Sequence, residues 1–200
     1  MLKNIVFVTV LLLLFLLGLW QLFRFNYKNS IIKNIGLPPT HLSQTDNLEK
    51  FNYKRVEIDG ILSNIELYVF AGKRGYYALS PMLLANGKYM LVNKYITKKK
   101  EVKQKEIIKT TLDGILDCNN NKNWFIKNNP SENTWFTLNT REISNELGIK
   151  LEKCILWKEF NKLSIQPMKH LEYAITWFVL ALIWLVIGIK TRRYAACNEF

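Results

Sequence analysis

Two apolar stretches, one near each end of the chain, constrain the fold more than any other feature. The first covers residues 5–23 and the second covers residues 171–189, and each has 19 residues. A helix that rises ~1.5 Å per residue needs about 20 apolar residues to cross the hydrocarbon core of a bilayer. Backbone amides find no water there, so a crossing segment is helical or part of a closed barrel. We therefore predict two transmembrane helices that flank a domain of residues 24–170.

The charges around the second stretch predict its direction in the membrane. Lys190, Arg192 and Arg193 follow it, whereas a single lysine lies close to its other end. An excess of lysine and arginine marks the cytoplasmic end of a span. We expect residues 190–200 to form a cytoplasmic tail, both termini to lie inside, and the 24–170 domain to lie outside. That compartment is the periplasm for a bacterial inner membrane, or the intermembrane space for a mitochondrial inner membrane.

The first stretch lacks the small residues of a signal-peptide cleavage site, so we expect it to be retained as an anchor. The domain between the anchors has 24 lysines and arginines against 14 acids, a formal charge of 24 − 14 = +10. A basic surface suits anionic lipid, an acidic partner or nucleic acid. The predicted topology argues against nucleic acid. A general bias of the chain toward Lys, Asn and Ile explains the same charge without any partner.

The chain has three cysteines, Cys118, Cys154 and Cys197, and none forms a C-x-x-C pair. Cys197 falls in the predicted cytoplasmic tail. Cys118 and Cys154 fall in the domain, where an oxidising compartment allows a disulfide. Two separate buried thiols explain them equally well, and the spacing does not decide between the two.

Apolar and charged residues alternate through much of the domain, as in strands with one buried face. Val56 and Ile58 begin this pattern, which Gly60 is expected to interrupt with a bulge. Asn86-Gly87 predicts a hairpin turn, and Pro81 is expected to end the strand before it. Further strands are predicted over residues 65–71, 76–80, 89–96, 107–116, 135–138 and 154–157.

A short helix is predicted over residues 140–148, with Asn139 as its N-cap and Gly148 at its C-terminal end. Several short strands with turn signals and few helices indicate a small sheet protein. The predicted fold class is a membrane-anchored α+β protein. Two transmembrane helices flank a mainly antiparallel β-sheet, or a small barrel, with one or two helices.

No nucleophile elbow, phosphate loop, dinucleotide fingerprint or zinc-protease motif is present in the sequence. The two histidines, His41 and His170, lie at the two ends of the domain. We therefore expect a protein that is not an enzyme. A membrane-anchored periplasmic enzyme is kept as a weaker alternative.

Polar and aromatic side chains gather at the predicted outer ends of the two spans. Trp20, Gln21 and Arg24 end the first span, while His170 and Tyr173 begin the second. The predicted topology places all five at a similar depth. Imidazole is a common ligand of haem iron, and a guanidinium pairs well with a carboxylate such as a haem propionate.

The second span also has a face of small residues below His170. Ala174, Ala181 and Gly188 recur every seven residues, with Trp177 close by. A flat macrocycle can lie in such a groove with His170 as its metal ligand. Small residues on a span also let two helices pack closely, and aromatic residues at span ends form interfacial belts. Both interpretations stay open. The candidate cofactor-binding residues are His170, Arg24, Trp20, Gln21, Tyr173, Ala174, Trp177 and Ala181, with His41 as the next candidate ligand.

Several motifs resemble those of one known family. The segments that carry the resemblance are LGLWQ at 17–21, YKRV at 53–56, NG at 86–87, LVN at 91–93 and HLEYAITWF at 170–178. In order along the chain they resemble the Surfeit locus protein one family, with the two anchor motifs the most specific. Asn133, Trp135 and Phe136 are similar to a later aromatic motif of that family.

The resemblance implies an assembly factor for haem–copper cytochrome c oxidase that holds haem A on its way to the catalytic subunit. It implies three partners: that subunit, the haem A synthesis machinery and membrane lipid. The ligand of the family corresponds to His170. The alternative is a membrane scaffold that stabilises an oxidase assembly intermediate without a cofactor.

Two departures from the family pattern stand out. The family often has Arg-Gly-Trp after Val-Asn, where this chain has Lys94-Tyr95-Ile96. An asparagine is usual two residues before the histidine, where this chain has Met168. These two departures predict that the hairpin and the approach to His170 behave differently from those of the family.

Overall fold

A computed structural model describes the chain except for residues 1, 44–46, 101–106, 120–125, 159–165 and 198–200. The chain divides into two compact units, one of residues 1–32 with 162–200 and one of residues 33–161.

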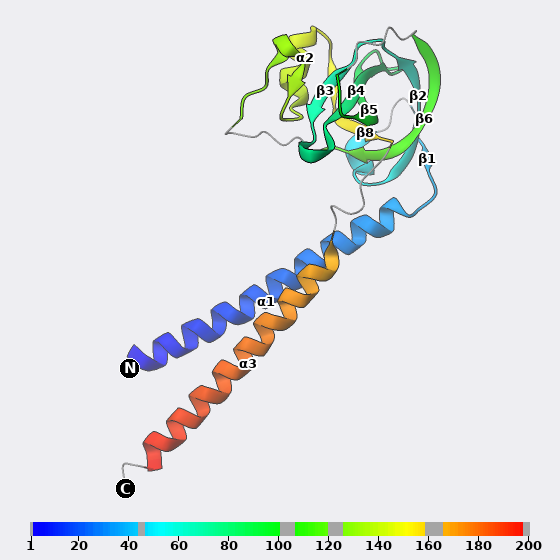
Figure 1. The fold of residues 1–200 in the computed structure, drawn as a ribbon. Helices are drawn as coiled ribbons and strands as arrows, with labels where there is room; N and C mark the ends of the chain where they lie inside the picture. The colour runs from blue at the N-terminus through cyan, green and yellow to red at the C-terminus, as the bar shows by residue number, and fades with distance from the viewer. Residues whose placement is uncertain (1, 44–46, 101–106, 120–125, 159–165, 198–200) are drawn as a thin grey trace. The chain divides into compact units, whose positions relative to one another are not determined.

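The first unit is a pair of long helices, α1 (Leu2–Ile35) and α3 (Pro167–Cys197), which run side by side (Figure 1). Pro167 begins α3, at the first helical position where its missing N–H costs no hydrogen bond. Within these helices, Asn4–Ile35 and Pro167–Thr191 are long and apolar enough to cross a membrane. The first contains residues 5–23 and the second contains residues 171–189, the two stretches that the sequence predicts to span a membrane.

The second unit is built on one eight-stranded sheet (Figure 1). Its strands follow the order β1-β2-β6-β8-β5-β4-β3-β7. They are β1 (Thr40–His41), β2 (Arg55–Leu62), β3 (Leu67–Phe70), β4 (Tyr76–Leu83), β5 (Tyr89–Thr97), β6 (Ile108–Asp117), β7 (Thr134–Trp135) and β8 (Leu151–Trp157). Three of the eight strand pairings are parallel, so the sheet is mixed. The expectation of a mainly antiparallel sheet is only partly right.

The sheet curls until β2 meets β4, but only over the pairs Ile61–Leu83 and Leu62–Met82. The sheet is therefore not a barrel, and that alternative is wrong. Gly60 lies at this meeting point, where an added Cβ would come within 2.7 Å of the Leu83 carbonyl oxygen. The pairing of β2 with β6 runs through Gly60 without a bulge. Gly60 thus serves close approach of two strands rather than a bulge.

The turn and helix signals are confirmed, whereas the expected effect of Pro81 is wrong. Asn86-Gly87 turns β4 into β5 with Gly87 at φ 77°, and α2 (Thr140–Leu147) has its N-cap at Asn139. β4 runs through Pro81. The carbonyl oxygen of Pro81 accepts a hydrogen bond from Ser63 N–H at 2.8 Å, which shows that its backbone polar side faces away from β5. The β3 ladder has already ended at Leu79, and toward β2 Pro81 acts only as an acceptor, so the proline interrupts no pairing with β3 or β5.

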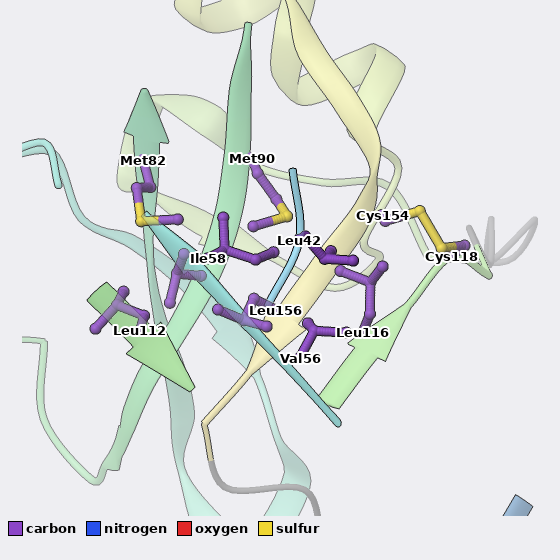
Figure 2. Packing of buried hydrophobic residues seen from close by; sticks show 11 residues of the cluster. Leu42, Val56, Ile58, Met82, Met90, Leu112, Leu116, Cys118, Cys154 and Leu156 are labelled. Atoms are coloured by element: carbon purple, nitrogen blue, oxygen red, sulfur yellow. A yellow bond between two sulfur atoms is a disulfide. The ribbon is translucent and has the colours of Figure 1, made fainter. Parts of the chain in front are cut away.

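Both faces of the central strands are buried, because neighbouring residues on a strand point to opposite faces. Val92 and Leu156 belong to one apolar cluster, shown in Figure 2, while Leu91 and Ile155 belong to another. The second cluster includes Ile143 of α2, so this helix covers one face of the sheet. Among the described residues, three 3₁₀ turns connect strands, at Leu48–Phe51, Gly72–Arg74 and Pro130–Glu132.

A disulfide joins Cys118, just after β6, to Cys154 in β8, at the edge of the first cluster (Figure 2). Both cysteines are buried, and β6 and β8 are neighbouring strands. The sequence leaves open whether these two cysteines pair, and the structure shows that they do.

Asp117, next to this disulfide, should make the stability of the domain depend on pH. Burial raises the pKa of its carboxyl above the ordinary 3.8, against opposing hydrogen bonds from Asn119. The folded state then binds the proton more tightly, so stability falls as the pH rises through the raised pKa. We expect Asp117→Asn to be more stable than the natural chain at pH 7 but not below pH 3.8, as measured by urea unfolding.

Asp113 offers a matched control of opposite sign. The Arg55 guanidinium beside it holds the pKa of that carboxyl below its ordinary value. Its contribution is therefore present at neutral pH and lost as the pH falls. Asp113→Asn should lower stability at pH 7, and a loss of stability there in Asp117→Asn as well would contradict the assignment for Asp117.

Candidate functional site

His170 and Gln21 come together at one end of the helix pair. The imidazole Nδ1 of His170, in the first turn of α3, lies 2.7 Å from Oε1 of Gln21 on α1. The amide oxygen is an acceptor, so Nδ1 carries the proton and donates the hydrogen bond. The lone pair of this tautomer is then on Nε2. The contact thus orients the ring of a predicted ligand, and with the amide oxygen as acceptor it favours the tautomer that carries the proton on Nδ1.

The other predicted residues at this end differ in position. Arg24 follows Gln21 by three residues on α1, which places the two on one face of the helix. Trp20 and Tyr173 are exposed, while Trp177 is half-buried. This end of the helix pair therefore has the imidazole of His170, which Gln21 orients, and the guanidinium of Arg24 on the same face of α1 as Gln21. It also has the exposed aromatic surface of Trp20 and Tyr173.

The small residues of α3 face α1 rather than an open groove. Ala174 and Ala181 are only 1% and 7% exposed. A Cβ on Gly188 would lie 2.1 Å from a ring carbon of Phe7, so the Phe7 ring packs directly on that glycine. The structure shows helix packing on this face, and cofactor binding by Ala174 and Ala181 stays a prediction. In this structure α1 lies against the face that the sequence suggested as a groove.

Two further contacts hold the helix pair, and the sequence analysis missed both. A Cβ on Gly18 would lie 2.7 Å from the Phe178 ring, so here α1 supplies the glycine and α3 the aromatic ring. The Trp184 indole N–H donates to the carbonyl oxygen of Phe7 at 3.1 Å. In the sequence, the available signal for this packing was the presence of glycines and aromatic residues on both spans.

A second polar cluster lies inside the sheet domain, around the carboxylate of Glu66. Lys94 donates from Nζ to Oε1, and the hydroxyls of Tyr95 and Tyr68 each donate to Oε2 at 3.0 Å. The side chains of Glu66 and Lys94 are only 7% and 10% exposed. No sequence pattern predicts this cluster, although two of its residues, Lys94 and Tyr95, stand where the chain departs from the family pattern.

A bulge in β5 directs Lys94 to this carboxylate. Leu79 of β4 is opposite Asn93 and Ala78 is opposite Tyr95, so Lys94 is the extra residue. Bulges re-aim side chains in this way. Asn133 holds the other side of the cluster, since its side chain donates to the Glu66 carbonyl oxygen at 2.7 Å.

His41, the second candidate ligand, lies on β1, where its Nε2 is 3.6 Å from Oδ2 of Asp59. Both side chains are largely exposed. The described residues contain no group of three or more His, Cys, Asp and Glu side chains that could hold a metal ion.

These features define a class: a membrane protein with two candidate membrane-spanning helices and one α+β domain. The family model of the SURF1 family matches residues 8–182, and the chain belongs to that family. This confirms the resemblance of its motifs to the Surfeit locus protein one family.

Curated relatives agree over nearly the whole chain. A SURF1-like protein of Rickettsia felis is 30% identical over 95% of this chain and 96% of its own length. One of Rickettsia conorii is 31% identical over 97% of this chain and 92% of its own length. A SURF1-like protein of Dictyostelium discoideum is 29% identical over 39% of this chain and 36% of its own.

Proposed function

We propose that this protein assists the assembly of a haem–copper cytochrome c oxidase by holding haem A for delivery to the catalytic subunit. The observation that carries the proposal is the hydrogen-bonded pair of His170 and Gln21 in a chain of the SURF1 family. Histidines that bind metals usually donate their other ring N–H to an acceptor, which orients the ring. Gln21 supplies that acceptor.

The residues at this end suit different parts of the cargo. His170 would hold the haem iron through Nε2, and Gln21 would keep the proton on Nδ1. Arg24 would pair with a propionate, because a guanidinium matches a carboxylate in shape and charge. Trp20, Tyr173 and Trp177 would contact the macrocycle. Ala174 and Ala181 would act indirectly, by letting the helices approach until His170 reaches Gln21.

In this proposal the sheet domain faces away from the cytoplasm. The Cys118–Cys154 disulfide supports this orientation, because disulfides persist in oxidising compartments such as the bacterial periplasm. The bases that follow the second span agree with it. The partners would be the oxidase catalytic subunit and the haem A synthesis machinery within a bacterial inner membrane, and the protein would transfer its cargo without catalysing a reaction.

A scaffold that binds no cofactor is the second candidate function. The burial of Ala174 and Ala181 between α1 and α3 favours it, since this face is fully explained by helix packing. In that case the protein would stabilise an assembly intermediate through its surface, and the His170–Gln21 contact would only join the two helices.

Replacing His170 by alanine separates these functions. We expect the natural chain, purified from cells that make haem A, to show a haem absorption spectrum, and His170→Ala to lose at least nine-tenths of it. The loss would follow from removal of the nitrogen that would hold the iron. Gln21→Ala should lower haem occupancy less, because the ligand stays but its ring is no longer held.

His41→Ala is the matched control and should keep full occupancy. Full haem with an unchanged spectrum in His170→Ala would show that His170 is not the ligand. A natural chain that carries no haem from such cells, although inserted in the membrane, would favour the scaffold.

A further inference from the structure

The turn between β3 and β4 brings two basic segments of the sheet domain together. One segment is this turn, residues 72–75, and the other is the end of β5 with the residues that follow it. A Cβ on Gly75 would lie 2.9 Å from the Cα of Lys98, so the two segments are in direct contact. Four exposed cations lie on them and form what we call the basic tip: Lys73, Arg74, Lys98 and Lys99.

The basic tip has no carboxylate of its own. Residues 67–100, which contain β3, β4 and β5, include seven lysines and arginines and no aspartate or glutamate. The three cations outside the basic tip are engaged elsewhere: Lys88 and Lys94 form ion pairs, and Lys100 donates to a backbone carbonyl oxygen at 2.9 Å. Within the described chain, none of the four cations of the basic tip forms an ion pair.

The guanidinium of Arg74 is held in a fixed position. One of its terminal nitrogens donates to the Tyr77 hydroxyl, and its central carbon lies 5.3 Å from the centre of the Tyr77 ring. Tyr77 is itself packed edge-on against Trp157, with ring centres 5.0 Å apart. A guanidinium has five N–H donors, so several remain for a ligand. A held fork of donors suits a carboxylate, which can accept two parallel hydrogen bonds.

An aromatic pair flanks the same turn. Phe70 ends β3 and Tyr76 begins β4, and their ring centres are 5.9 Å apart. The Phe70 ring also contacts Phe136, yet Phe70 remains 46% exposed. Aromatic residues and arginine are enriched in the cores of protein interfaces, whereas lysine is depleted there. Arg74 and Phe70 thus have the chemistry of an interface core, and the lysines have that of its rim.

We propose that the basic tip and Phe70 bind an acidic segment of a partner polypeptide, in which carboxylates flank an apolar side chain. One carboxylate would pair with Arg74, and the apolar side chain would cover the exposed part of the Phe70 ring. The three lysines would speed the encounter, because exposed charges steer association and are screened by salt. The proposal concerns the sheet domain and is independent of haem binding at His170.

The occupant is a polypeptide rather than a lipid surface because Arg74 is held in place beside an aromatic anchor. An anionic membrane surface attracts basic residues according to their number and does not require a fixed guanidinium. A carboxylate, by contrast, distinguishes the fork of an arginine from the point charge of a lysine. The same contrast separates the proposal from a general bias of the chain toward lysine, which would make all exposed lysines equivalent.

The test uses the full chain in a neutral detergent and the peptide Gly-Asp-Glu-Phe-Glu-Asp-Gly-amide with tetramethylrhodamine on its amino end. We expect saturable binding by fluorescence anisotropy at low ionic strength. The same peptide with alanine for phenylalanine should bind at least about fivefold more weakly, because it cannot cover the Phe70 ring. The peptide with lysine for each acid should not bind. No saturable binding of the first peptide, or equal binding of all three, would overturn the proposal.

Substitutions that differ in place but not in charge locate the site. Lys73→Gln with Arg74→Gln should lower affinity at least about tenfold, whereas Lys109→Gln with Lys150→Gln removes two exposed cations elsewhere on the domain and should change it less than about twofold. Urea unfolding checks that both double variants fold like the natural chain. Equal losses in the two would show attraction to net charge alone and would overturn the proposal.

Arg74→Lys distinguishes the possible occupants. It keeps the charge but loses the fork, and should weaken peptide binding at least about fivefold. His170→Ala should bind the peptide as the natural chain does, so the result does not depend on haem. Displacement of the peptide by dihexanoyl-phosphatidylglycerol but not by dihexanoyl-phosphatidylcholine, with unchanged binding to Arg74→Lys, would make an anionic lipid the occupant and would likewise overturn the proposal.

Discussion

Replacing Glu66 by alanine is expected to lower the free energy of unfolding of the sheet domain by about 3–5 kcal/mol. The side chain of Lys94 is 10% exposed, so its charge would remain buried after its carboxylate is removed. The hydroxyls of Tyr95 and Tyr68 would lose the same acceptor. Urea unfolding of the full chain, followed by tryptophan fluorescence, measures the change.

Two variants make this result interpretable. Glu66→Leu combined with Lys94→Met should cost much less than Glu66→Ala, since an apolar pair replaces a buried ion pair with little loss. Glu49→Ala breaks the exposed pair with Lys153, and should change stability by about 1 kcal/mol or less. If Glu66→Ala costs no more than Glu49→Ala, the cluster does not stabilise the domain in the way proposed.

The local elements of this fold were predictable because each depends on residues close in sequence. The apolar stretches, the Asn86-Gly87 turn and the Asn139 cap each satisfy their own backbone groups. The parallel pairing of β5 with β8 was not predictable, because it joins segments separated by α2 and no local pattern encodes it. The place of Pro81 within a strand was not predictable for the same reason, because a strand tolerates proline there only where the pairing with β3 has ended.

The candidate site shows the same contrast between local features, which were predictable, and long-range contacts, which were not. The spacing of the two spans pointed to His170 and Gln21 at one depth, and the structure joins them. The role of the small residues could not be predicted without knowing the partner helix, since only the position of the Phe7 ring shows what faces Gly188. Glu66 gave no signal, because its partners are Lys94 and Tyr95, 28 and 29 residues away. Long-range side-chain pairs of this kind leave no periodic pattern in a sequence.

Removing the disulfide is expected to lower the free energy of unfolding by about 4 kcal/mol, because the cross-link closes a loop and restricts the unfolded chain. The bonded cysteines are 36 residues apart in sequence. We expect the double variant Cys118→Ala with Cys154→Ala to unfold at much lower urea concentration than the natural chain. Both positions are buried, so loss of sulfur packing adds to the effect.

A reductant separates the cross-link from packing. Dithiothreitol should lower the unfolding midpoint of the natural chain toward that of the double variant, and should leave the double variant unchanged although it keeps Cys197. A natural chain that is indifferent to reductant, with both thiols free to alkylation after non-reducing denaturation, would show that the bond does not form. That result would also remove the disulfide as support for an oxidising compartment, and the orientation would then rest on the charges after the second span.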